Sequence, residues 1–262
     1  MRAVAVHRDA IVVTSRFWQT TATAIRAPGG GESFLIDSPY FPDELELLPM
    51  LLQQSGFPEP SGLLATHADW DHLLGRYAFP GLALGVGSST GERLRAEPGA
   101  AQRELRDADA DFYVVRPSPL ALGSYQVLPV PGKMQIGDEE IELHPTGGHT
   151  VDGVAFLVRS ASLLVCGDYV SDVEIPWISP GGGIDDYRAT LARLSALIEE
   201  GCDAIIPGHG SPHDRSRALQ IVDEDLDYLD ALERGEQRPK LPAGRDTRRQ
   251  RAIHAENLQR LL

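Results

Sequence analysis

The chain has 262 residues, 42% of them hydrophobic, and a formal net charge of −14 at pH 7. This length and composition suffice for one α/β domain with a full core, while the acidity opposes binding to nucleic acid phosphates and anionic membranes. We therefore expect no nucleic acid or membrane partner, and, because no N-terminal or internal apolar run is long enough to target or span a membrane, a cytoplasmic protein.

The first quarter of the chain predicts strands followed by one helix. Residues 10–18, 20–27 and 33–37 are apolar or alternating and rich in β-branched side chains, which predicts an antiparallel opening of a sheet. Residues 42–56 carry leucines at helical spacing, with Pro near the start and Gly at the end. Pro49 interrupts this helix, so we expect a kink or two short helices.

A dense group of metal-binding side chains follows the predicted strand over residues 62–66. His67, Asp69, Asp71 and His72 fall within six residues. A strand-like period of two points the first three the same way, and a tight loop would bring His72 beside them. The alternative is a polar loop in which Asp69 or Asp71 caps a short helix.

The middle of the chain predicts further helices and a second sheet region. Helices are expected over residues 72–77 and 89–107, on either side of a strand over residues 82–86. The second sheet region is predicted from four apolar runs, around residues 125–130, 139–145, 154–159 and 163–167.

Three more candidate ligands each follow an apolar strand-like run and have glycine beside them: His149, Asp168 and His209. Glycine permits a positive φ and suits loops that turn a side chain into a shared cleft. Cys166 precedes Asp168 by two positions, so it is either a small core residue or a group near the site. His213, shortly after His209, is a candidate to orient a ligand.

An irregular loop over residues 169–184 follows Asp168 and can roof a cleft. Trp177 and Ile178 would contact substrate there, or Trp177 would pack as core. Tyr169 would donate a proton to a leaving group, or its ring would pack beside the metals. Asp37 ends a strand at the same edge, where a carboxylate can steady a ligating histidine.

The C-terminal part predicts helices over residues 185–200 and 214–232 around a strand over residues 204–207, then a polar connection over residues 233–245 and a last helix. Residues 231–262 hold eight Lys/Arg against four Asp/Glu. The basic segment 245–251 is either a docking patch or the solvated face of the last helix.

The ordered motifs resemble the metallo-β-lactamase superfamily: His-x-His-x-Asp-His, a His preceded by Gly, an Asp after Gly, and a terminal Gly-His-Gly. The resemblance covers roughly residues 31–213. It implies an α/β fold, a four-layer αββα sandwich of two mixed β-sheets flanked by helices, as a single domain over residues 1–262 with a C-terminal helical extension at about residues 233–262. It assigns His67, Asp69 and His149 to one metal and Asp71, His72 and His209 to a second, with Asp168 bridging.

One position departs from the family pattern, because Asp69 stands where the family has its second histidine. A hard, anionic oxygen replaces a borderline nitrogen donor, so iron or manganese competes with zinc. Diiron members of the superfamily carry a carboxylate at this position. We expect two divalent metal ions, zinc first, with iron and manganese as alternatives.

These assignments predict a metal-dependent hydrolase acting on a small ester, lactone, thioester or amide through a metal-bound hydroxide. Asp71 would be both ligand and orienter of the attacking water, and Tyr169 the second candidate catalytic residue. An iron-dependent redox enzyme of the same fold and a non-catalytic metal-binding protein are the alternatives. The expected partner is a small-molecule substrate, and a homo-oligomer is left open.

Overall fold

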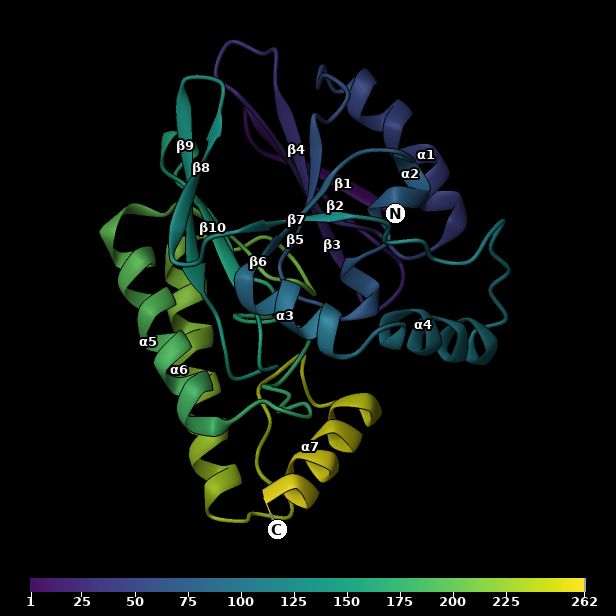
Figure 1. The fold of residues 1–262 in the computed structure, drawn as a ribbon. Helices are drawn as coiled ribbons and strands as arrows, with labels where there is room; N and C mark the ends of the chain where they lie inside the picture. Colours follow the sequence, from purple (N-terminus) through teal and green to yellow (C-terminus); the bar gives the residue numbers. More distant parts are fainter. Residues whose placement is uncertain (262) are drawn as a thin grey trace.

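Two β-sheets lie between helices in the computed structural model, which describes residues 1–261 (Figure 1). The first sheet has seven strands whose spatial order is their chain order. They are β1 (Arg2–His7), β2 (Ala10–Thr14), β3 (Thr21–Arg26), β4 (Ser33–Asp37), β5 (Gly62–Ala65), β6 (Leu84–Gly87) and β7 (Tyr125–Leu128). Strands β1 to β4 pair antiparallel, and β4 to β7 pair parallel.

The second sheet has five strands in the order β12-β11-β10-β9-β8. They are β8 (Gly132–Ile136), β9 (Glu139–Pro145), β10 (Val154–Val158), β11 (Leu163–Val165) and β12 (Ala204–Ile206). Pairing is antiparallel from β8 to β11 and parallel between β11 and β12. Both sheets are therefore mixed, as predicted.

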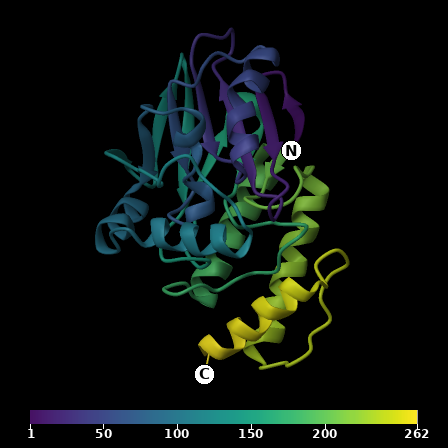
Figure 2. The ribbon, with the colours of Figure 1, turned by 90° about the vertical axis from the view of Figure 1, so that its right-hand side faces the viewer.

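The helices are α1 (Pro42–Gln54), α2 (Gly75–Ala78), α3 (Ser88–Ala96), α4 (Ala100–Asp111), α5 (Ile184–Gly201), α6 (Arg215–Glu233) and α7 (Arg248–Leu261). Figure 1 shows α5 and α6 beside the second sheet and α1 and α2 on the side of the first. In Figures 1 and 2, α7 lies below both sheets.

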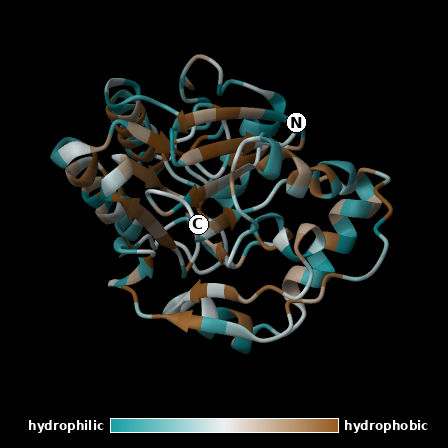
Figure 3. Cartoon of the chain, turned by 90° about the horizontal axis from the view of Figure 1, so that it is seen from above, coloured by the Kyte–Doolittle hydropathy of each residue, from teal (hydrophilic) through white to brown (hydrophobic). Residues whose placement is uncertain are grey.

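Three buried apolar clusters hold these layers together. One joins α1 to the first sheet, for example Leu48 with Leu63, and another joins α5 and α6 to the second sheet. The third joins the two sheets, with Val12 and Ile36 from the first and Phe156 from the second. Figure 3 shows the strands as predominantly apolar. Because apolar area removed from water is the main favourable term in folding, this pattern confirms the four-layer αββα sandwich.

The sheets differ from the sequence-based expectation at three strands. β1 and β8 were not predicted; β1 is mostly exposed and β8 is only partly buried, so neither shows a clear apolar signal. β7 was assigned to the second sheet region, but it pairs parallel with β6 in the first. Strand partners depend on tertiary packing, which local pattern does not report.

Three helix predictions are also corrected. The helix expected over residues 89–107 is two helices, α3 and α4, because Pro98 and the left-handed Gly99 (φ 77°) separate them. The helix expected over residues 72–77 is a 3-10 turn, Trp70–His72, followed by α2. Conversely, α1 continues through Pro49, so the two-helix alternative is wrong.

Within the described residues, no helix combines the length and the apolar character that crossing a bilayer would require.

Candidate metal centre

The loops that follow four strands bring the predicted ligands to one edge of the sandwich. His67 follows β5, His149 follows β9, Asp168 follows β11 and His209 follows β12. All four side chains are at least nine-tenths shielded from solvent. Strand ends of packed sheets share an edge, so residues far apart in sequence converge there.

The first expected triad lies together. The candidate ligand atoms of His67, Asp69 and His149 lie within 4.8 Å of one another. Asp69 Oδ2 is 3.4 Å from His149 Nε2 and 3.6 Å from His67 Nε2. One carboxylate oxygen thus faces two imidazole nitrogens.

The second expected triad is formed in the same way by Asp71, His72 and His209, whose candidate ligand atoms also lie within 4.8 Å of one another. His209 Nε2 is 3.4 Å from Asp71 Oδ2, and His72 Nε2 is 3.9 Å from Asp71 Oδ1.

Asp168 lies between the two triads. Its Oδ2 is 3.3 Å from His149 Nε2 and 3.4 Å from His209 Nε2, and its Oδ1 is 3.2 Å from His72 Nε2. This position is the one expected of a bridging carboxylate. The structure thus brings all seven expected ligands together in the expected division; metal binding itself stays a prediction.

The donor atoms at the centre of this group lack other partners. Nε2 of His67, His72 and His149 and Oδ1 of Asp168 are buried without a hydrogen bond to the described residues. Such atoms cost about 1–3 kcal/mol each when left unsatisfied. Cations coordinated by nitrogen and carboxylate oxygen would satisfy all of them, so the donor set fits two metal ions.

The opposite ring nitrogen of each of three histidines contacts an oxygen. Nδ1 of His72 is 3.0 Å from Asp37 Oδ2, that of His149 is 2.8 Å from the Trp177 carbonyl, and that of His209 is 3.1 Å from the Trp18 carbonyl. An N–H donated from Nδ1 leaves Nε2 free as the ligating atom and fixes the ring. For Asp37 this is the role expected from the sequence.

Two of these orienting groups sit on left-handed backbone. Asp37 has φ 58°, and its carboxylate also accepts from the Thr66 N–H at 2.8 Å. Trp18 and Gln19 have φ 46° and 55°, although neither is glycine. Non-glycine residues held there cost free energy and cluster at functional sites. The turn at Trp18 was missed by sequence reasoning because no motif marks it.

A second residue missed by sequence reasoning is Arg93, on α3. Its Nη1 is 2.8 Å from Asp69 Oδ1 and 2.9 Å from Asp152 Oδ1. The other oxygen of Asp152 accepts from the Ala68 N–H at 2.9 Å, inside the metal-ligand loop. The extra carboxylate at position 69 therefore has a cationic partner, which offsets part of its negative charge.

Glu174 is a third missed residue. It is buried in the loop after Asp168, and one of its oxygens lies within 4.8 Å of candidate ligand atoms of Asp168 and His209. Its side chain also pairs with Arg249 of α7. Without an adjacent motif, the sequence offered no signal for either residue.

A cleft of about 300 Å³ opens over the two triads. All three tryptophans of the chain line it: Trp18, Trp70 and Trp177. Trp177 is half-buried; it packs against the core, and its ring centroid lies 5.6 Å from that of His149. The packing role is confirmed, and contact with substrate stays a prediction. Ile178 is buried in the core, so the expectation that it contacts substrate is wrong.

The hydroxyl of Tyr169 forms hydrogen bonds with backbone groups. This buried hydroxyl accepts from the His149 N–H at 2.9 Å and donates to the Gly147 carbonyl at 2.7 Å. Burial raises the pKa of this phenol well above its ordinary value. These contacts agree with the packed-ring alternative, in which Tyr169 supports the loop that carries His149.

Cys166 and His213 lie outside the groups of candidate ligands found among the described residues. Cys166 is fully buried, and burial raises the pKa of its thiol well above the ordinary value. This environment is that of a small core residue. His213 is buried too, and its backbone bridges to that of Ile205.

The carboxylates also control the charge of the histidines. Burial alone would lower the pKa of His149, but Asp69 and Asp168 raise it to about 9. Burial would likewise lower that of His209, and Glu174 and Asp168 raise it to about 9. In the metal-free protein, His149 and His209 therefore bind protons in place of the metal cations that they would otherwise coordinate.

Comparison with sequence families gives one match. The model described as "Metallo-beta-lactamase superfamily" matches residues 15–209. Acyl-coenzyme A thioesterase MBLAC2 of Gallus gallus is 27% identical over 196 residues, covering 69% of this chain and 68% of that protein. Its namesake in Homo sapiens is 28% identical over 172 residues, covering 61% of this chain and 59% of that protein. The chain thus spans about three fifths to two thirds of these relatives.

Solved structures share the fold at low sequence identity. A metallo-beta-lactamase family protein of Thermus thermophilus has a TM-score of 0.68 at 19% identity, covering 97% of this chain and 92% of its own. The sec-alkylsulfatase Pisa1 of Pseudomonas sp. has a TM-score of 0.75 at 14% identity, covering 99% of this chain and 50% of its own. A protein solved in a di-iron-bound form, TTHA1623, has a TM-score of 0.61 at 22% identity, covering 80% of this chain and 97% of its own.

Proposed function

The chain belongs to the metallo-beta-lactamase superfamily as a hydrolase, and we propose that it is a dinuclear metal enzyme whose substrate is an acyl thioester. The observation that carries the metal assignment is the set of buried, unpartnered Nε2 atoms around Asp168. The thioester follows from the acyl-coenzyme A thioesterases among its relatives, and it narrows the ester, lactone, thioester or amide expected from the sequence.

Each triad would hold one cation, and Asp168 would contact both. Bound cations at such a site supply Lewis acidity, which lowers the pKa of water and polarises a carbonyl oxygen. The protein's own contribution is position: Asp37 and the Trp18 and Trp177 carbonyls fix the histidine rings. Asp71, which faces the cleft, would also accept a hydrogen bond from the attacking water and orient it.

No cysteine nucleophile is required for this chemistry. Cys166 and Cys202 are both buried, and burial raises the pKa of each thiol. A thiol kept protonated in this way is a poor nucleophile. Metal ions held by the two triads and Asp168 would supply the activation of water, which is the proposed nucleophile.

Trp70 and Trp177 would bind the acyl part of the substrate. Trp18 and Trp70 lie with ring centroids 5.9 Å apart on one part of the cleft, and Trp177 lies by His149. Aromatic side chains bury large apolar areas, so this lining favours an apolar acyl group and displaces water from the scissile bond.

An iron-dependent redox reaction is the second candidate, favoured by the carboxylate of Asp69. Arg93 weakens this case because its guanidinium neutralises part of the carboxylate's charge. The proposal also includes a small-molecule substrate and a cytoplasmic location, and no nucleic acid or membrane partner, which agrees with the net charge of −14.

The test combines elemental analysis of the purified protein with hydrolysis assays on an acyl-coenzyme A series, a lactone and a β-lactam. We expect two metal ions per chain and the highest kcat/KM on a thioester. Asp168→Asn should lower kcat/KM at least about 100-fold and reduce the bound metal, whereas exposed Asp185→Asn should change neither. Metal-independent hydrolysis, or oxygen-dependent turnover on bound iron, would contradict the proposal.

A further inference from the structure

The basic C-terminal segment is folded into the protein at its first arginine. Arg245 is completely buried; it donates to the Glu174 carbonyl at 3.1 Å and to Glu224 Oε2 at 2.6 Å, and it pairs with Asp225. A buried, multiply bonded arginine fixes the backbone around it. The sequence predicts either a docking patch or a solvated helix face for this segment. Arg245 is buried and fits neither prediction.

Helix α7 is also bound to the loop that borders the cleft. The side-chain oxygen of Gln250 accepts from the Ile175 N–H, and that of Asn257 accepts from the Ile178 N–H, both at 2.9 Å. Asn257 donates in turn to the Pro176 carbonyl at 2.8 Å. These hydrogen bonds fix the position of α7 relative to the loop and place the start of the helix at the cleft.

With α7 in this position, Arg249 lines the cleft. Its guanidinium carbon lies 4.1 Å from the centroid of the Trp18 ring, and its Nη1 pairs with Glu174. The side chain is 31% exposed. Its Nε and Nη2 make no hydrogen bond to the described residues, so two donors remain for a ligand.

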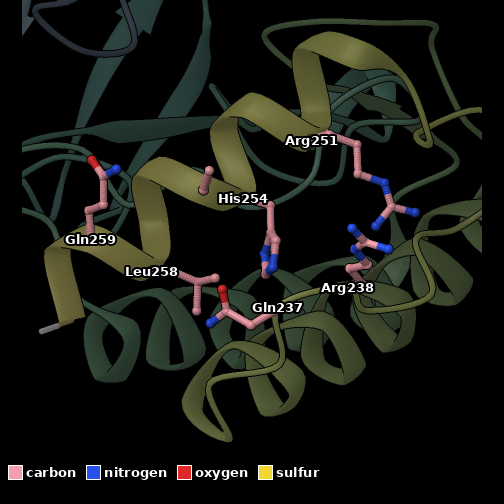
Figure 4. A pocket seen from close by; sticks show the side chains of 7 residues that line it. Gln237, Arg238, Arg251, His254, Leu258 and Gln259 are labelled. Carbon is pink, nitrogen blue, oxygen red and sulfur yellow. The ribbon is translucent and has the colours of Figure 1, made fainter.

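The other arginines nearby are less suited to bind a ligand. Arg93 also lines the cleft, but one nitrogen of its guanidinium is shared by Asp69 and Asp152. Figure 4 shows the side chains of Arg238 and Arg251 converging at one end of a separate pocket, which has a volume of about 520 Å³ and lies beside α7. There Arg251 is already bonded to both carboxylate oxygens of Asp246 and to the Pro239 carbonyl.

We propose that Arg249, carried by the C-terminal helix, binds a phosphate of the substrate's carrier and so selects thioesters of a phosphate-bearing thiol. This rests on the proposed thioesterase function. Apart from Arg93, Arg249 and His209, the titratable side chains that line the cleft are carboxylates, including Glu97 and Glu104, which repel an anion. A guanidinium with two free donors forms charge-assisted, paired hydrogen bonds to phosphate, so the anionic end of the substrate would lie at α7 and the acyl end over the metal centre.

The test is calorimetric binding of coenzyme A and of pantetheine to the metal-loaded protein. Both ligands carry the same thiol arm, but only coenzyme A carries phosphates. We expect coenzyme A to bind at least about tenfold more tightly to the wild type, Arg249→Ala to abolish that difference by weakening coenzyme A alone, and Arg249→Lys to retain part of it. Arg248→Ala is the matched control: this arginine is its exposed neighbour on α7, and its loss should leave the ratio unchanged.

An unchanged ratio in Arg249→Ala would overturn the assignment, as would equal weakening of both ligands, which would indicate that Arg249 only supports the cleft. Because binding is measured without turnover, the two proposals separate. Binding of coenzyme A through Arg249 without thioester hydrolysis refutes the proposed function alone. If the protein hydrolyses thioesters but Arg249→Ala leaves the ratio of coenzyme A affinity to pantetheine affinity unchanged, only the role proposed for Arg249 is refuted.

Discussion

Arg93 Nη1 lies 2.8 Å from Asp69 Oδ1, on the side of that carboxylate away from the histidines. The other oxygen, Oδ2, faces His67 and His149. Arg93 thereby makes Asp69 a ligand with one available oxygen and brings a positive charge next to it. The position at which this chain departs from its family pattern thus has a compensating residue elsewhere in the sequence.

Replacing Arg93 should destabilise the metal-free protein more than the metal-loaded protein. Arg93→Gln removes the guanidinium that pairs with both Asp69 and Asp152, and removing one partner of a buried pair costs about 3 kcal/mol. Bound metal recovers part of that loss, so the gain in Tm on adding metal should be larger than in the wild type. Thermal unfolding with and without metal measures this, and exposed Arg95→Gln on the same helix is the control. Equal Tm gains in variant and wild type would show that Arg93 does not balance the charge of Asp69.

The identity of residue 69 should control metal preference. Asp69→His restores a nitrogen donor, which zinc accepts more readily than manganese or iron do. Loading the metal-free protein with an equimolar mixture of zinc and manganese, followed by elemental analysis, should give a higher zinc fraction than in the wild type. The same metal ratio in both proteins would refute a role for Asp69 in selectivity.

The stability of the metal-free protein should fall as pH rises. The pKa values of His149 and His209 are raised from 6.5 to about 9 in the folded protein. Folding is therefore favoured by their protonation below pH 6.5, and that contribution is lost as pH rises through about 9. The Tm of chelator-treated protein should drop by several degrees between pH 6.5 and 9.

Metal-loaded protein is the control for this pH series, because cations then take the place of the protons and the drop should be much smaller. A metal-free Tm that stays constant or increases over this range would contradict the charge state assigned to the two histidines.

Tyr169→Phe distinguishes the two roles considered for this residue. Loss of the hydroxyl leaves the His149 N–H without its partner, whereas the Gly147 carbonyl still accepts from the Thr190 hydroxyl. The expected cost is roughly 2 kcal/mol in unfolding free energy. A supporting residue should give this loss with weaker metal binding and a kcat within about tenfold of wild type. A proton donor would instead give a much larger fall in kcat with metal content unchanged, which calorimetry and steady-state kinetics separate.

The sequence by itself determined the set of candidate ligands and most of the secondary structure. Motifs such as residues 66–72 and 207–210 are local: a strand, a tight turn and the ligating side chain lie within a few residues. The helices with a regular apolar stripe, α1, α5 and α6, were predicted for the same reason, because 3.6-residue periodicity is visible without neighbours.

Only the tertiary structure decided which strands pair and what surrounds the ligands. β7 joins the first sheet rather than the second, and nothing within its own residues specifies that partner. Arg93, Glu174 and Arg249 come from α3, a loop and α7, and they meet the site only because the sheets and helices pack around one edge. Most charged side chains are exposed to solvent. The neighbouring sequence therefore gives no sign that packing places such a side chain against a carboxylate that is distant in the chain.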